Sequence, residues 1–156
     1  MGGRAMNKIR TKADFRALRE ELGLSQTDLG RALGVKTLTV KRWEKDGPEG
    51  FLVPDDAWDS IDEWADLHRR SVDCMVERCV SAFEKHGDYP KVVTITYFRS
   101  QDDYDACGRD QRPFGFANAV ARGAARELRR LGFEVRFDYP DSDGNLYRKA
   151  AARESD

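Results

Sequence analysis

The stretch from residue 26 to residue 45, QTDLGRALGVKTLTVKRWEK, constrains the fold of this chain more than any other segment. Gly34 can adopt the left-handed backbone conformation that ends a helix without Cβ strain. Gly30 is small enough for a second helix to cross closely over it. Apolar side chains for the inner faces of the two helices are supplied by Leu29, Leu33, Val35, Val40 and Trp43. The segment therefore predicts two short helices that cross steeply at a tight turn.

Capping signals predict where the first helices begin. Thr11 with Asp14, and Ser25 with Asp28, have the spacing of a capping box, in which two side chains bond the backbone N–H groups at a helix start. Gly23 lies before the second of these signals and ends the first helix. One helix is thus expected before the two crossing helices.

Two crossing helices of this kind are typical of a helix-turn-helix, whose second helix enters the major groove of DNA. At 100° per residue, Val40 and Trp43 point inward on that helix. The candidate DNA contacts are therefore its outer side chains and the first residue of the preceding helix: Gln26, Lys36, Thr37, Leu38, Lys41 and Arg42. The alternative interpretation is a solvated helix face without a partner.

These side chains suit different parts of the duplex. The fork of Arg42 can bond O6 and N7 of guanine, and Thr37 and Leu38 can contact thymine methyl groups. Lys36 and Lys41 suit phosphates or guanine. Gln26, at the positive end of its helix, suits a backbone phosphate.

The charge distribution agrees with a basic reading face, although the net charge is −1. Residues 1–50 carry eleven Lys and Arg against seven Asp and Glu, a net of +4. Residues 51–90 carry four against ten, and residues 91–156 carry twelve against eleven. A local basic surface, and not the overall charge, attracts phosphates.

The second half predicts a long helical region followed by a small domain. Residues 54–86 keep helical spacing as one helix, or as two with a bend near residues 68–70. After them we expect a strand at 91–98, a short helix capped by Ser100, an amphipathic helix at 115–131 and a strand at 133–139. The expected fold class is α+β: an all-α head, a connecting helix and a strand-helix-helix-strand domain.

Four segments follow from this pattern. They are a helix-turn-helix domain at 7–53, one or two connecting helices at 54–86, a dimerisation domain at 90–140 and a polar tail at 141–156. A sheet of only two strands is too small to be stable alone, so pairing with a second chain is expected. Aromatic residues on the long region could add to that contact or fill the chain's own core: Trp58, Trp64 and Phe83.

Composition excludes several other classes. No apolar run approaches the length needed to span a bilayer, so no membrane role is expected. Cys74, Cys79 and Cys107 form no disulfide or zinc pattern, which favours a reduced, cytoplasmic setting without metal or cofactor. The acidic and Arg-rich cluster at 99–112 lacks an accompanying base, so capping and solvated charges explain it better than catalysis, and no enzyme is predicted.

Residues 18–46, LREELGLSQTDLGRALGVKTLTVKRWEKD, resemble the Cro/C1-type, or XRE-family, phage-repressor domain, and the resemblance covers about residues 11–60. Gln26, Gly34, Trp43 and Glu44 stand where that family commonly has Gln, Gly, a large apolar residue and Glu. The resemblance implies that Gln26 contacts phosphate and holds the reading helix.

By the same resemblance, Thr37, Leu38 and Arg42 fall at positions that read bases. Two positions depart from the family. Lys36 replaces the usual Ser- or Thr-like cap, which leaves the start of the third helix open, and Asp46-Gly47 replaces the usual Asn-Gly.

The order of elements in the second half is similar to that of small phage-borne regulators, including some anti-CRISPR-associated repressors, which implies dimerisation by this part. The expected function is sequence-specific regulation of transcription, with repression as the expected direction. The chain is expected to bind an inverted repeat in double-stranded DNA as a homodimer. Two alternatives stay open: an antitoxin whose second domain pairs with a toxin, and a regulator that senses a small ligand. No protein partner is identified.

Overall fold

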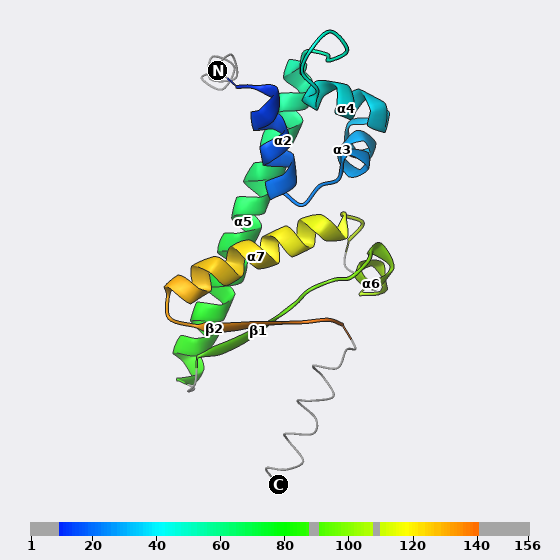
Figure 1. Ribbon diagram of the computed structural model, residues 1–156. Coiled ribbons are helices and arrows are strands. Elements are labelled where there is room, and N and C mark those ends of the chain that lie inside the picture. The colour runs from blue at the N-terminus through cyan, green and yellow to red at the C-terminus, as the bar shows by residue number, and fades with distance from the viewer. Residues whose placement is uncertain (1–9, 88–90, 108–109, 141–156) are drawn as a thin grey trace. The chain divides into compact units, whose positions relative to one another are not determined.

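The computed structural model describes residues 10–87, 91–107 and 110–140 (Figure 1). The chain divides into two compact units, Met1–Arg70 and Ser71–Asp156. The boundary lies inside a long helix, α5 (Asp55–His86), which gives its first half to one unit and its second half to the other.

The first unit begins with three short helices, α2 (Lys12–Glu21), α3 (Gln26–Leu33) and α4 (Thr37–Glu44). Both predicted capping boxes are present. The hydroxyl of Thr11 accepts from the N–H of Asp14 at 3.1 Å, and the Asp14 carboxylate accepts from the N–H of Thr11 at 2.7 Å. The same exchange at the start of α3 confirms the second predicted helix start.

Phe15 lies at the centre of the core of this unit. Its ring makes edge-on contacts with Trp43, at 5.9 Å between ring centroids, and with Trp58, at 5.1 Å. The other buried apolar residues of the unit are Leu22, Leu24, Leu29, Val40, Val53, Ala57 and Ile61. The first half of α5 therefore completes this core. Of the two alternatives for Trp58, a dimer contact and the chain's own core, the structure shows the second, because its ring is buried here.

Helix α5 settles the choice between one helix and two. It runs as one helix from Asp55 to His86, continuing through residues 68–70. Neither proline nor glycine stands inside these residues, so nothing in the backbone forces a break. Within the described ranges, none of the helices has the length and apolar character needed to cross a membrane.

The second unit contains β1 (Val92–Thr96), α6 (Gln101–Ala106), α7 (Phe114–Arg130) and β2 (Glu134–Asp138), besides the second half of α5. The predicted order of strand, helix, helix and strand is confirmed, and the fold is α+β. The two strands pair in parallel, from Val92 opposite Glu134 to Thr96 opposite Asp138. Helix α7 packs on both strands, as Figure 1 shows.

Asn118, buried within the apolar face of α7, fixes the chain where it leaves β1. Its side-chain carbonyl accepts from the N–H of Phe98 and its amide donates to the Phe98 carbonyl, both at 2.8 Å. A buried amide with both groups bonded satisfies the backbone where strand pairing ends. Sequence patterning did not single out this residue.

The polar cluster at residues 99–112 serves its own segment of chain. Ser100 accepts from the N–H of Asp103 at the start of α6, and Arg99 pairs with the Asp103 carboxylate at 2.9 Å. The Tyr104 hydroxyl donates to Asp110. These capping and ion-pair contacts are the kind that the sequence predicts for the cluster. Arg109 lies outside the described residues.

Candidate nucleic-acid interface

The two glycines set the crossing of α3 and α4. Gly34 ends α3 with φ of +69°, and the N–H of Val35 returns to the Gly30 carbonyl at 2.8 Å. A Cβ atom added to Gly30 would lie 2.9 Å from the Val35 carbonyl oxygen, which is closer than real Cβ contacts. The predicted need for a small residue and for a left-handed residue is confirmed.

The start of α4 is fixed without a capping side chain. Lys36 occupies the cap position and makes no side-chain bond to the helix backbone, and α4 begins at Thr37. The Thr37 hydroxyl bonds the Thr27 hydroxyl on α3 at 3.2 Å. This bond joins the first turns of the two helices.

The end of α4 is held by a lysine from another helix. The Lys12 ammonium on α2 donates to the Trp43 carbonyl at 3.0 Å, to the Arg42 carbonyl at 3.4 Å and to the Phe51 carbonyl. The last carbonyls of a helix lack partners inside it and carry partial negative charge, so a cation there is favourable. The sequence offers no signal for this contact.

A buried ion pair joins α2 to α4. Arg19 and Glu44 approach to 2.7 Å, and their side chains are only 9% and 3% exposed. A second nitrogen of Arg19 donates to the Leu24 carbonyl at 2.8 Å. Because the two charges are out of water and both bonded, this pair fixes the position of α4 against α2.

Gln26 lies beside the same pair. Its amide donates to the second oxygen of Glu44 at 3.3 Å, and its side chain is half-buried at the first turn of α3. Arg19, Glu44 and Gln26 therefore form one chain of contacts across α2, α4 and α3. Gln26 is positioned by α4 and lies at the positive end of α3.

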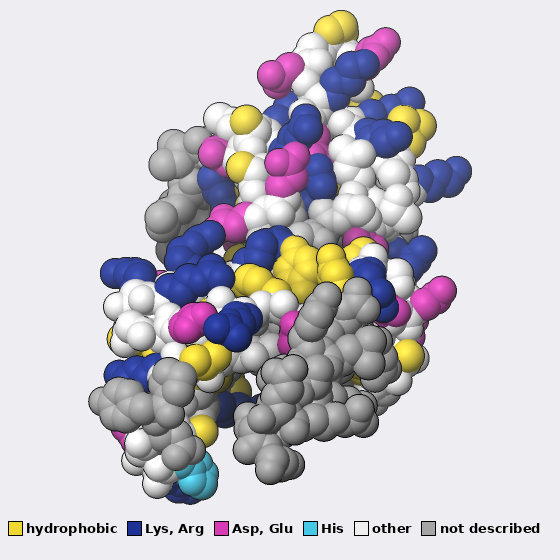
Figure 2. All heavy atoms as spheres, turned by 60° about the horizontal axis from the view of Figure 1, so that its bottom comes forward, with side chains coloured by type: hydrophobic (Ala, Val, Ile, Leu, Met, Phe, Trp, Pro, Cys, Tyr) yellow, Lys and Arg dark blue, Asp and Glu magenta, His cyan; other side chains and the backbone are white. Residues whose placement is uncertain are grey.

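The remaining candidate residues share the outer surface of α4. Val40 and Trp43 are buried, as the helix phase predicts, and Leu38 is 54% exposed. Lys36, Lys41 and Arg42 are exposed, and Thr37 is half-buried. On the face drawn in Figure 2, basic and acidic side chains are interspersed.

Phe51 supports Arg42 in a way that the sequence did not indicate. The guanidinium carbon of Arg42 lies 4.8 Å from the centre of the Phe51 ring, and the N–H of Phe51 donates to the Arg42 carbonyl at 2.9 Å. The cation–π contact limits the conformations open to the arginine. Phe51 itself is 46% exposed, and this ring forms one wall of a shallow surface hollow of about 470 Å³ beside α4.

The outer surface of α4 combines hydrogen-bond donors with methyl groups, which are the groups that base edges in the major groove can accept or contact. The helix itself is fixed at both ends and on its inner side. Such a helix can place side chains against base edges in the major groove without losing its own structure.

A comparison with family models places residues 15–49 in the helix-turn-helix family. No curated protein matches the chain in sequence. The match runs from α2 to the loop after α4 and does not support the resemblance of the second half to anti-CRISPR-associated repressors. The family consists of DNA-binding regulator domains and is not an enzyme family. Residues 15–49 therefore form a helix-turn-helix domain of the Cro/C1 type, and this match supports a DNA-binding transcription regulator.

Proposed function

We propose that this chain represses transcription by binding an inverted-repeat operator as a homodimer, with α4 as the reading helix. The observation that carries the proposal is the outer surface of α4, which is exposed while the helix is fixed on every other side. Six residues are proposed as DNA contacts: Gln26, Lys36, Thr37, Leu38, Lys41 and Arg42.

Arg42 is the proposed source of the strongest base preference. Resting on the Phe51 ring, its fork is pre-oriented for the two acceptors of a guanine. Leu38 and Thr37 are proposed to contact thymine methyl groups, and Lys36 and Lys41 to contact phosphates. In this proposal, the contacts to bases determine sequence preference, and the contacts to phosphates position the protein on the duplex.

Gln26 is proposed to bond a phosphate from the first turn of α3. Because Gln26 also contacts Glu44, a phosphate bound by Gln26 would have a fixed position relative to α4. The positive end of α3 adds to the attraction.

The homodimer is proposed because one small head reads too few base pairs for the affinity of a specific regulator. The second unit supports it, since its two-stranded sheet leaves an outer edge on each strand. Residues 90–140 are the proposed dimerisation domain. The resemblance to phage repressors favours repression, in which a bound operator blocks transcription.

Arg42→Ala tests the reading helix on an operator recovered from a random pool of duplexes. We expect a loss of about 1–3 kcal/mol and relaxed preference at one base pair per half-site. Gln26→Ala should weaken binding to all DNA sequences by a similar amount. In a reporter strain, the native chain should lower expression from that operator and Arg42→Ala should not.

The matched control is Arg69→Ala, which removes another exposed arginine, this one from α5. Its binding should equal that of the native chain. Unchanged affinity for Arg42→Ala would show that another surface reads the DNA.

A further inference from the structure

Strand β1 has an outer edge whose backbone groups face away from β2. The N–H of Glu134 donates to the Lys91 carbonyl and the N–H of Tyr97 donates to the Asp138 carbonyl, both at 2.8 Å. Backbone groups alternate in direction along a strand. The residues whose N–H and C=O groups face outward are therefore Val92, Thr94 and Thr96.

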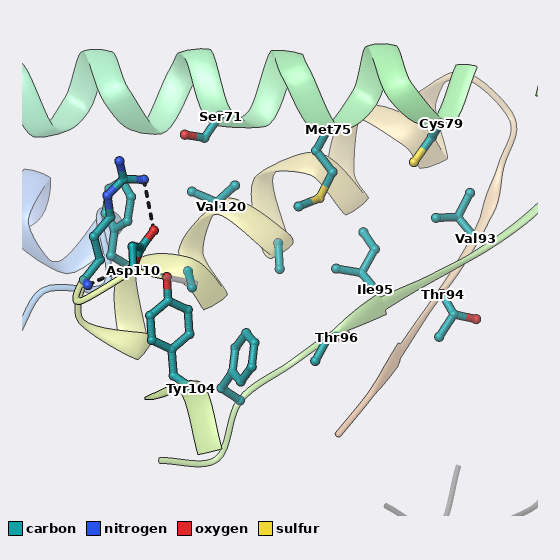
Figure 3. A pocket seen from close by; sticks show the side chains of 15 residues that line it. Ser71, Met75, Cys79, Val93, Thr94, Ile95, Thr96, Tyr104, Asp110 and Val120 are labelled. Carbon is teal, nitrogen blue, oxygen red and sulfur yellow. Dashed lines mark hydrogen bonds and ion pairs between the residues drawn. The ribbon is translucent and has the colours of Figure 1, made fainter. Parts of the chain in front are cut away.

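Part of this edge borders open space. Residues 93–96 line a cavity of about 370 Å³, whose opposite wall includes Ser71, Met75 and Cys79 of α5 (Figure 3). Met75 and Cys79 are only half-buried. Where the chain is described, no hydrogen bond from its own residues reaches the outward backbone groups of β1. Among the described residues, none therefore pairs with this edge, and apolar side chains lie beside it.

The two strands differ in the features that protect an edge. Natural edge strands are protected from pairing by charged side chains. The five residues of β1, Val92–Thr96, carry no charge, and each of them is β-branched. β2 carries Glu134, Arg136 and Asp138, and Arg129 donates to its Val135 carbonyl at 3.2 Å. Of the two strands that the structure describes, only β1 therefore lacks charged side chains that would protect its edge.

We propose that β1 pairs with β1 of a second copy in an antiparallel arrangement, with the two-fold axis at Thr94. The strands then run in the order β2, β1, β1 and β2. This inference rests on the homodimer of the proposed function and names its pairing strand. Full overlap of the five residues places Thr94 opposite Thr94, Val92 opposite Thr96 and Val93 opposite Ile95, which are favourable cross-strand pairs.

The same pairing of β2 would be unfavourable. Full overlap of Glu134–Asp138 places Arg136 opposite Arg136, and Glu134 opposite Asp138 in both copies. Like charges directly opposite each other destabilise a strand pair. Charge therefore selects the β1 edge over the β2 edge.

Thr94→Cys tests the position of the axis. It is made in a full chain whose Cys74, Cys79 and Cys107 are replaced by serine, after sedimentation shows that this background keeps the native oligomeric state. Residues opposite each other in a hydrogen-bonded antiparallel pair have Cα atoms about 5.5 Å apart, within the range of a disulfide. Mild oxidation should convert most Thr94→Cys chains to covalent dimers.

Arg136→Cys in the same background is the matched control, since it lies opposite Thr94 in the parallel register and is exposed. It should stay monomeric on a denaturing gel. A cross-link through Arg136→Cys but not through Thr94→Cys would overturn the inference in favour of the β2 edge.

Thr94→Lys gives an independent measurement on the chain with its natural cysteines. It places two ammonium groups at the axis and should raise the dimer dissociation constant roughly fivefold or more while leaving circular dichroism unchanged. A native dimer that neither cross-links through Thr94→Cys nor responds to Thr94→Lys would overturn this inference and leave the proposed function standing. A native chain that is monomeric would overturn both.

Discussion

Replacing Trp43 with alanine is expected to lower the free energy of unfolding of the first unit by about 3–5 kcal/mol. Only 6% of Trp43 is exposed, and its ring meets Phe15 edge-on at 5.9 Å. The substitution removes buried apolar surface from α4 and leaves a cavity beside Phe15. It should therefore loosen the reading helix at the point where it is anchored.

The measurement is denaturant unfolding followed by circular dichroism, because two other tryptophans complicate fluorescence. Leu38→Ala is the control on the same helix, since Leu38 is largely exposed and its loss should cost less than about 0.5 kcal/mol. Equal stability of Trp43→Ala and the native chain would contradict the assigned phase of α4.

Glu44→Gln is expected to lower the free energy of unfolding by about 3 kcal/mol or more. The substitution keeps the shape of the side chain but leaves the buried Arg19 guanidinium with only the exposed carboxylate of Glu20, at 3.8 Å, as its opposite charge. A buried charge that loses its buried partner costs more than the pair contributes to stability when intact. Unfolding by urea at neutral pH measures the effect.

Glu49→Gln is the matched control, because it removes the same charge from an exposed pair with Lys45. Exposed pairs contribute less than about 1 kcal/mol, so little change is expected. If both variants lost the same small amount, burial would not strengthen the Arg19–Glu44 pair, and its assigned role in fixing α4 would be wrong.

Local signals predicted the parts of the first unit that depend on neighbouring residues. The capping boxes at Thr11 and Ser25 and the left-handed Gly34 are properties of a few consecutive residues, and all are present. The phase of α4 also follows from spacing alone, since Val40 and Trp43 recur on one side. For this reason, the starts, ends and buried faces of these helices could be predicted from the sequence.

Contacts between distant residues were not predictable in the same way. Arg19 and Glu44 are 25 positions apart, and Lys12 meets Phe51 across 39. Periodicity identifies the apolar face of a helix. It does not show whether that face packs in the chain's own core or against a second chain. Trp58 illustrates this, because its helical spacing is equally compatible with a dimer contact and with the core beside Phe15, where it lies.

The second unit shows a further limit. Alternation of apolar and polar residues predicted β2, but the same period of two occurs in parallel and antiparallel strands. The parallel pairing became apparent only with the register of Val92 opposite Glu134. The positions proposed to contact DNA stay a prediction from helix phase, exposure and resemblance.

Sedimentation velocity of the full chain, alone and with its selected operator duplex, tests the central claim most directly. At tens of micromolar the chain should sediment as a dimer, and the complex should contain two chains on one inverted-repeat duplex. A monomer that binds its operator tightly as one chain per duplex would contradict the account.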